Sequence, residues 1–257
     1  MRLHAFIIGW SGWENSCESI AAMVFPHVEK LTVVYSNSGE VEYEGVGEAV
    51  RVPNDWFYGR KFEECLRRFD GDVMLQIHAD AFLNRAGWAR LIERCRYSFG
   101  KYESLGVWAP EINYTPWDFD LVEISDTDDE CSKSVAQTDG VVWALSNKVL
   151  ERLRFIEFEQ NNLGWGVDWI SIAYSFSNNL LVLRDVSVCV DHPRGSGYLG
   201  KQAVAQMNIF LKQMSAQEKT QYALLNEIIE TRRVKRWLEN RSIKQRVFSR
   251  ISKTIQK

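Results

Sequence analysis

The sequence has few cysteines, and they form no recognisable framework. Its 257 residues contain five cysteines, an odd number, and no two of them make a C-x-x-C pair. Small secreted domains rely on paired cysteines, whereas zinc and redox motifs rely on closely spaced ones. We therefore expect a chain with reduced thiols that works in the cytoplasm.

Long apolar runs are also absent. No stretch reaches the roughly 18 consecutive apolar residues that a membrane-spanning helix requires. The opening segment, MRLHAFIIGWSGWENS, has one early arginine and a very short apolar run, which predicts a first strand rather than a signal peptide. If the protein works at a membrane, we expect it to be peripheral and to lie on the inner face.

Two glycine-rich signatures are missing after this first strand. No G-x-G-x-x-G follows it, which argues against a dinucleotide-dependent oxidoreductase. The loop GWSGWENS also lacks the arginine that a sugar nucleotidyltransferase would carry there. The sequence contains no internal repeat and no low-complexity linker, so we expect one large domain with an appendage.

Charge is distributed unevenly along the chain. Hydrophobic residues make up 46% and charged residues 25%, which is ordinary for a soluble globular protein. The net charge is −3, but residues 231–257 hold ten Lys or Arg and one Glu, whereas residues 1–230 hold 21 basic and 33 acidic residues. We predict a globular domain over residues 1–200 and a helical extension over residues 201–257 that is basic and amphipathic from about residue 231.

The sequence leaves three contact surfaces open for this extension: an anionic membrane, the acidic domain of the same chain, or a second copy of the extension. Its apolar residues recur at helical spacing among the basic ones; they are Val234, Trp237, Leu238, Val247, Phe248, Ile251 and Ile255. Basic amphipathic helices bind anionic membrane surfaces, but such a helix also packs on an acidic domain or dimerises. Nucleic acid is not expected, because the rest of the chain is acidic and has no recognisable base-reading module.

The order of apolar and amphipathic segments predicts an α/β fold. Strands are expected at 3–9, 31–39, 48–54 and 72–80, with helical stretches at 16–24, 59–69 and 85–99 between or after them. Such alternation favours a mostly parallel central sheet flanked by helices. Residues 113–134 are acidic and aperiodic, and we expect a mobile loop there.

Chemistry-bearing residues follow the ends of these segments. The stretches are HAD (78–80), GWGVDW (164–169) and VDHPRGSGY (190–198), and each places Asp or His at a strand end or a helix start. Ligands in α/β sheets bind beyond the carboxyl ends of the strands. Carboxylate oxygen suits Mg²⁺ or Mn²⁺, and imidazole is better tolerated by Mn²⁺.

In this order the segments resemble the glycosyltransferases of the GT-A fold, similar to family 2, which transfer sugars from nucleotide-sugar donors with the help of a metal. VVYSNSGE resembles the end of the nucleotide-binding strand, and the run from PNDWFYGRKF to QIHADAF resembles the approach to the D-x-D motif. TDGVVWALSNKVLERL resembles the segment beneath the acceptor, GWGVDW the turn with the catalytic base, and DHPRGSGY the late metal-binding histidine. The resemblance covers roughly residues 3–198.

This resemblance implies a role for each residue. Asp80 and His192 would hold Mn²⁺ or Mg²⁺, and Asp168 would be the general base of an inverting transfer. The donor is expected to be a UDP-sugar and the reaction a hexosyl transfer to a glycan or lipid-linked glycan, as in the assembly of surface polysaccharides. Ser11, Asn37, Glu40, His78 and Asp80 would bind the donor nucleotide, whereas Asp139, Trp165 and Gly166 would contact the sugar or acceptor.

The sequence departs from the family pattern at two positions, and simpler interpretations stay open. His78 stands where the family often has the first Asp of D-x-D, and Val167 stands where the base-bearing turn often has another acid. A GT-A-like protein that binds nucleotide or sugar without turnover is therefore one alternative function, and binding of an anionic partner through the basic extension is the other. Asp80 and Asp168 also suit helix caps, Asp139 suits a turn, and either histidine suits a structural role.

Overall fold

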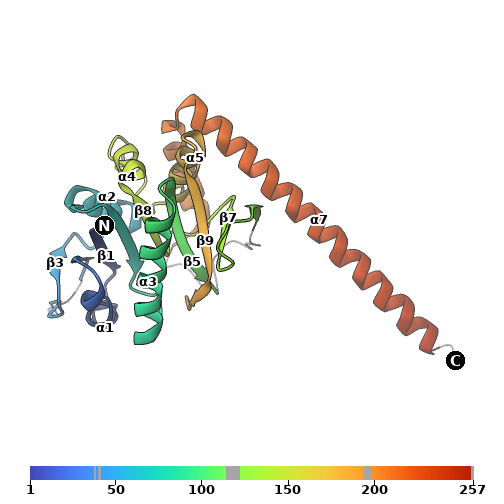
Figure 1. The fold of residues 1–257 in the computed structure, drawn as a ribbon, viewed down its shortest axis with the longest axis horizontal. Coiled ribbons are helices and arrows are strands. Elements are labelled where there is room, and N and C mark those ends of the chain that lie inside the picture. Colours follow the sequence, from blue (N-terminus) through green and yellow to red (C-terminus); the bar gives the residue numbers. More distant parts are fainter. Residues whose placement is uncertain (38, 40–41, 114–121, 194–197, 256–257) are drawn as a thin grey trace.

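The computed structural model describes residues 1–37, 39, 42–113, 122–193 and 198–255, with the backbone alone for residues 236–255 (Figure 1). The described strands form one nine-stranded sheet in the order β3-β2-β1-β4-β8-β5-β9-β7-β6. Helices flank it, as the alternating sequence pattern predicts. Glu40 lies outside the described residues, so its predicted role in nucleotide binding stays a prediction.

The first half of the sheet is parallel. β1 (Leu3–Gly9) pairs with β2 (Lys30–Tyr35) on one side and with β4 (Val73–His78) on the other, and β3 (Glu48–Arg51) pairs with β2. β1 is fully buried, because sheet neighbours cover both of its edges and helices cover both of its faces. The carboxyl ends of β1, β2 and β4 therefore lie along one edge of the sheet.

The second half of the sheet is mixed, so the prediction of a mostly parallel sheet was only partly right. β8 (Val142–Ser146) lies antiparallel between β4 and β5 (Leu105–Ile112), and β9 (Leu181–Val190) is parallel to β5. β7 (Ser132–Val135) and β6 (Glu123–Ser125) continue antiparallel from β9. Because β8 is reversed, its amino end lies beside the carboxyl end of β4.

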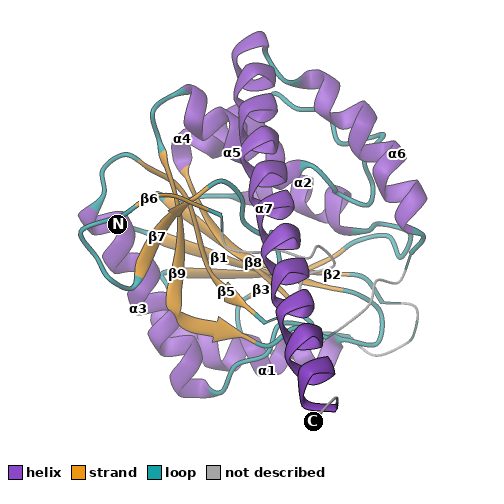
Figure 2. Cartoon of the chain, turned by 90° about the vertical axis from the view of Figure 1, so that its right-hand side faces the viewer, coloured by secondary structure: helices purple, strands orange, loops and turns teal. Residues whose placement is uncertain are grey.

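Two hydrophobic layers form on the two faces of the sheet (Figure 2). Side chains of β1 alternate between them, with Phe6 and Ile8 on one face and Ala5 and Ile7 on the other. The first layer includes α2 (Tyr58–Arg68), α4 (Asn147–Leu153), α5 (Val167–Ser177), α6 (Gly200–Phe210) and the start of α7 (Ala216–Ile255). The second includes α1 (Glu14–Val24) and α3 (Arg85–Lys101), and single 3₁₀ turns follow α1 and α6 at Phe25–His27 and Leu211–Gln213.

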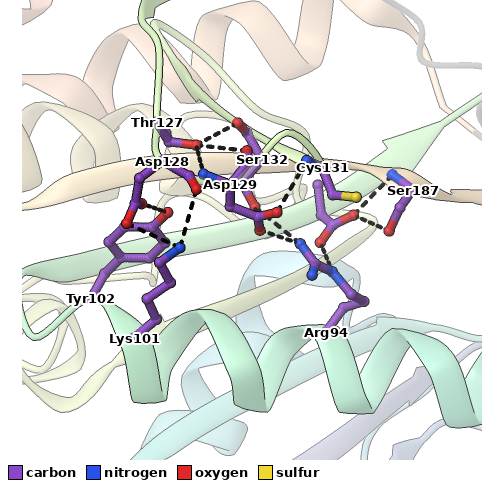
Figure 3. A network of polar contacts seen from close by, with 10 residues as sticks. Arg94, Lys101, Tyr102, Thr127, Asp128, Asp129, Cys131, Ser132 and Ser187 are labelled. Carbon is purple, nitrogen blue, oxygen red and sulfur yellow. Dashed lines mark hydrogen bonds and ion pairs between the residues drawn. The ribbon is translucent and has the colours of Figure 1, made fainter.

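Part of the predicted loop at 113–134 forms β6, the edge strand of the sheet, and its neighbour β7. Arg94 of α3 pairs with Asp129 in the turn between these strands and donates to Asp185 of β9 at 2.5 Å (Figure 3). The neighbouring Asp128 accepts a hydrogen bond from Tyr102 at 2.5 Å. Asp128 and Asp129 are therefore paired with basic and hydroxyl groups, and the expectation of a mobile loop was wrong for residues 123–134.

The first turns of α7 are anchored to the domain. Arg152 of α4 forms an ion pair with the buried Glu218 at 2.7 Å, and Leu225 and Ile229 pack into the core. Beyond this contact α7 continues as one helix to Ile255 and leads away from the sheet (Figure 1). The predicted boundary at residue 200 stays a prediction. Within the described part of the chain, no helix combines the length and apolarity needed to cross a bilayer.

A close backbone contact joins the start of α2 to the loop before α5. Gly59 N donates to Asn162 O at 2.8 Å, and a Cβ on Gly59 would lie 1.8 Å from the carbonyl oxygen of Asn161. Gly164 in the same loop has φ +78°, a conformation that favours glycine. Only glycine at position 59 lets these two segments approach so closely.

We predict that Gly59→Ala lowers the free energy of unfolding by about 1–3 kcal/mol or more, because the added methyl group forces the loop backbone away. The midpoint of urea unfolding at constant m-value measures this change. The matched control is Gly100→Ala in the last turn of α3, where an added Cβ meets nothing within 4 Å. That substitution is expected to be neutral or stabilising by about 0.5–1 kcal/mol, and equal losses in both variants would contradict the contact.

Candidate functional site

A cavity of about 490 Å³ opens at the edge of the sheet where β1 and β4 end. Seven of the residues predicted from the sequence line it: His78, Asp80, Asp139, Trp165, Gly166, Asp168 and His192. They come from the end of β4, the start of β8, the start of α5 and the chain after β9. The sheet therefore gathers residues that are up to 114 positions apart in the sequence into one cavity.

Two other predicted residues are not part of the cavity lining. Ser11 is exposed in the turn after β1. Asn37 is buried at the end of β2, where its Oδ1 accepts a hydrogen bond from Gly39 N at 2.6 Å. Both stand at the carboxyl edge of the sheet, so their predicted contact with a nucleotide stays a prediction.

A carboxylate between two imidazoles forms the polar centre of the cavity. His192 Nε2 lies 3.4 Å from Asp80 Oδ2, and His78 Nδ1 lies 3.9 Å from Asp80 Oδ1. Burial disfavours the ionised form of Asp80, but the hydrogen bond from His192 and the nearby His78 outweigh burial and hold the pKa of Asp80 below its ordinary value. Burial lowers the pKa of His78 to about 4, so this imidazole is neutral at pH 7.

Backbone pairing sets the relative position of Asp80 and His192. Phe82 N donates to Asp191 O at 2.8 Å, and Asp191 N donates to Phe82 O at 3.1 Å, which makes an isolated antiparallel bridge. The bridge joins the turn after β4 to the chain after β9. His192 N is held in addition by Asn113 Oδ1 at 2.9 Å. Asp80 is not a helix cap, because Asn84 caps α3 by accepting from Gly87 N.

The surroundings of Asp80 fit a divalent cation that takes some of its ligands from the protein and the others from a bound anion. Asp80 Oδ1 and His78 Nε2 are buried and have no hydrogen-bond partner among the described residues. No three His, Cys, Asp or Glu side chains in the described ranges are arranged to hold a metal ion by themselves. Mg²⁺ commonly takes one or two carboxylates and completes its shell with water and substrate phosphates. Asp80 and His192 match this kind of incomplete protein site.

Asp168 lies in the first turn of α5, on another wall of the cavity. The helix begins after Gly166, which has φ +93° and stands at the N-cap position, so Asp168 is the second residue of the helix and does not occupy the N-cap considered for it. Burial raises the pKa of Asp168 to about 7, and the nearby negative charge of Asp139 adds to this rise. A carboxyl group with a pKa near neutrality is suited to accept a proton at physiological pH. Asp168 is the only acid in the sequence GWGVDW. The preceding Val167, which stands where an acid was expected from the family pattern, is fully buried in the core.

Asp139 makes the turn considered for it, and its predicted contact with a sugar stays a prediction. Its Oδ1 accepts a hydrogen bond from Val141 N at 2.8 Å, which makes a turn into β8, and the residue also lines the cavity. Burial raises its pKa. A carboxylate in this position is available to a hydroxyl group of a ligand.

Aromatic rings form much of the remaining wall. Trp10 and Trp13 follow β1 and line one part of the cavity, whereas Trp165 and Tyr198 pair with each other in another. Trp165 Nε1 donates to Tyr198 Oη at 2.7 Å. Rings in a cavity with a few polar groups are typical of small-molecule sites.

The sequence analysis missed two buried polar residues that support the cavity. Lys61 is fully buried, donates to Gly9 O at 2.6 Å and to Ser36 Oγ at 2.7 Å, and lies 5.3 Å from the Trp10 ring. It therefore joins the ends of β1 and β2. Burial lowers its pKa to about 7. The available signal was a lysine within the apolar stripe of α2, one turn before Cys65.

Gln76 is the second such residue. Its Oε1 accepts from Tyr58 Oη at 2.7 Å and from Trp143 Nε1 at 2.5 Å. Tyr58 in turn packs on His78, with ring centroids 4.8 Å apart. The signal in the sequence was a glutamine in the otherwise apolar strand β4, where a buried amide needs partners.

Comparison with known proteins identifies the fold. No protein-family model matches the sequence, and a search of curated proteins finds no match. Among solved structures, glucosyl-3-phosphoglycerate synthase from Mycobacterium tuberculosis in complex with Mn²⁺, UDP and phosphoglyceric acid matches with a TM-score of 0.57 and 14% identity, over 84% of this chain and 80% of that chain. Its complex with Mg²⁺ and UDP matches with a TM-score of 0.57 and 15% identity, over 84% and 81% of the two chains.

A second protein with this likeness is GalNAc-T7 in complex with UDP, GalNAc and Mn²⁺. It matches with a TM-score of 0.58 and 11% identity, over 77% of this chain and 44% of that chain. Both neighbours are glycosyltransferases of the GT-A fold whose structures contain UDP and a metal ion. At these identities the likeness concerns the fold, and this chain has the GT-A fold.

Proposed function

We propose that the protein is an inverting, metal-dependent glycosyltransferase that moves a sugar from a nucleotide-sugar donor, a UDP-sugar, to a glycan or lipid-linked glycan. The observation that carries the proposal is one cavity that holds both Asp80, a carboxylate whose pKa is held below its ordinary value, and a second carboxyl group, Asp168, with a pKa near 7. The UDP and metal complexes of the two structural neighbours support the choice of donor.

Four residues that line the cavity have a part in the proposed reaction. Asp168 takes the proton from the attacking hydroxyl group of the acceptor, and the single displacement that results inverts the anomeric carbon. Asp80 and His192 would hold Mn²⁺ or Mg²⁺ in this cavity. When bound, the cation neutralises the charge that develops on the leaving diphosphate. His78, neutral and flanked by Trp10 and Tyr58, faces the same ligand.

The donor site predicts a metal-dependent gain in thermal stability. UDP with Mn²⁺ is expected to raise the melting temperature, whereas either alone has a smaller effect, because the protein offers only part of the coordination shell. A ligand at a hundredfold excess over Kd stabilises the folded state by about 2.7 kcal/mol. Thermal unfolding with a panel of nucleoside diphosphates measures the effect.

Asp80→Ala is expected to abolish this stabilisation. The control is Glu103→Ala, which removes an exposed carboxylate from the turn before β5, at the opposite edge of the sheet. It is expected to keep the full shift. The proposal fails if no nucleoside diphosphate stabilises the wild-type protein in the presence of the metal.

Asp168→Asn is expected to lower kcat by about 10²–10⁴-fold while UDP and Mn²⁺ still bind. In the wild type, the pKa of about 7 means that kcat/KM rises as the pH increases through 7, because the ionised form accepts the proton. Steady-state rates from pH 5 to 9 measure both effects. A variant with full activity would exclude Asp168 as the base, and a wild type that binds donor but never turns over would favour the non-catalytic alternative.

A stability measurement tests the same carboxyl group without substrate. The pKa of Asp168 is higher in the folded state than the value near 4 of an unfolded chain, so the folded state binds the proton more tightly. The wild type should therefore lose stability relative to Asp168→Asn as the pH rises from about 4 to above 7. Denaturant unfolding of both proteins at pH 5 and pH 8 measures this difference.

We also propose that residues 231–257 bind an anionic membrane surface, where a lipid-linked acceptor would be found. The supporting observation is that α7 continues as a helix for 26 residues beyond Ile229, and that residues 230–235, the last of its residues whose side chains are described, are all exposed. The sequence gives this segment a net charge of +9, and basic helices bind anionic lipid.

Deleting residues 231–257 should abolish sedimentation with vesicles that contain phosphatidylserine and leave the melting temperature unchanged, since the described contacts that anchor α7 come from Glu218, Leu225 and Ile229. Binding of the full chain should weaken as salt increases, because exposed charges are screened. Vesicles of phosphatidylcholine alone are the control. Equal sedimentation of the full and shortened chains would contradict the proposal.

A further inference from the structure

His192, a metal ligand in the proposed function, follows an irregular stretch of β9. The pairing of β5 with β9 shifts its register between Pro110 and Glu111, so that residues 186–188 of β9 have no counterpart in β5. Extra residues of this kind disrupt the ladder of hydrogen bonds locally and bend the strand. The position of His192 therefore depends on the contacts that the chain makes after these extra residues.

Asn113, the residue after β5, makes three of these contacts. Its main-chain N donates to Val190 O at 3.0 Å, which continues the ladder. Its side chain spans the next two residues, because Oδ1 accepts from His192 N at 2.9 Å and Nδ2 donates to Asp191 Oδ1 at 2.5 Å. A main-chain N–H only donates and an ionised carboxylate only accepts, so an amide satisfies both neighbours in one orientation.

The segment that carries His192 is thereby held from two sides. The main chain of Asp191 forms the bridge with Phe82, in the turn that follows Asp80, whereas Asn113 holds the Asp191 side chain from the end of β5. The bond to His192 N fixes the peptide group in front of the imidazole, whose Nε2 lies 3.4 Å from Asp80 Oδ2. The described lining of the cavity does not include Asn113, so any effect of this side chain on a ligand passes through its neighbours.

We propose that Asn113 is the positioning residue of the metal site: by binding His192 N and the Asp191 carboxylate together, it holds the His192 imidazole where it shares a divalent cation with Asp80. The inference rests on the proposed function, in which Asp80 and His192 are the metal ligands. Groups outside the coordination shell that orient a ligand commonly change metal affinity 10–100-fold when they are removed. Asn113 touches no group that lines the cavity except His192, and its effect is therefore on the affinity for the metal.

Titration of the full chain with Mn²⁺ in the presence of UDP tests the proposal, with the electron paramagnetic resonance signal of free Mn²⁺ as the readout. Asn113→Ala removes both side-chain bonds without a change in charge and should raise the Kd for Mn²⁺ at least tenfold. The matched control is Asn178→Ala, an exposed asparagine after α5 whose side chain donates to Tyr174 O at 2.8 Å, outside the cavity. It should keep the wild-type Kd, and an unchanged Kd in Asn113→Ala would overturn the inference.

Exchange of the two partners separates positioning from a general loss of structure. In the double variant Asn113→Asp with Asp191→Asn, the carboxylate and the amide change places and the net charge stays the same. The introduced carboxylate accepts from His192 N and from the introduced amide, so both bonds are kept. This variant should bind Mn²⁺ within about threefold of the wild type, and a loss as large as that of Asn113→Ala would overturn the inference.

A double-mutant cycle with His192 tests the route of the effect. If Asn113 acts through the imidazole, Asn113→Ala in a His192→Ala background should change the Kd for Mn²⁺ by less than about threefold, because coupled residues are not additive. A further tenfold loss in that background would overturn the inference.

The wild type separates this inference from the proposed function. If Mn²⁺ binds the wild type with UDP and Asp80→Ala abolishes this binding, the metal site stands, and an Asn113→Ala variant that binds equally well makes the positioning role alone wrong. If the wild type binds no Mn²⁺ in the presence of any nucleoside diphosphate, the proposed function fails and this inference fails with it.

Discussion

Two backbone hydrogen bonds between Phe82 and Asp191 determine where the polar centre of the cavity forms. They join the turn after β4 to the chain after β9, although β8 and β5 lie between these strands in the sheet. Without this bridge, Asp80 and His192 would belong to two independent loops. With it, both side chains meet at 3.4 Å, and the hydrogen bond contributes to keeping Asp80 ionised. The proposed metal site thus depends on a contact between main-chain groups.

The position of the candidate site could be predicted from the sequence because it follows from sheet geometry. Parallel strands gather their carboxyl ends at one edge, so the polar residues after apolar strands converge there whatever their distance in sequence. His78, Asp80 and His192 all follow apolar strands in this way. Asp168 was found by a different signal, a glycine-rich turn before an apolar helix, and Gly164 and Gly166 both have positive φ there.

Other features of the fold could not be predicted from the sequence. The sequence of β8 predicts a strand, but it does not predict that the strand runs antiparallel to β4 and β5. The direction of a strand within the sheet is set by the tertiary arrangement. β6 and β7 are short strands at one end of the sheet without apolar periodicity, and side chains of other elements, such as Arg94 and Tyr102, hold the turn between them. Lys61 lies in an apolar stripe, where its partners, Gly9 O and Ser36 Oγ, are visible only once β1 and β2 are side by side.

The length of α7 has a mechanical consequence. From Ile229 to Ile255 the helix advances about 39 Å at 1.5 Å per residue. A flexible linker of the same number of residues would span only about 28 Å on average and would let the domain turn freely. A continuous helix acts instead as a spacer: whatever holds its far end sets both the distance of the domain from that anchor and the direction in which the cavity opens.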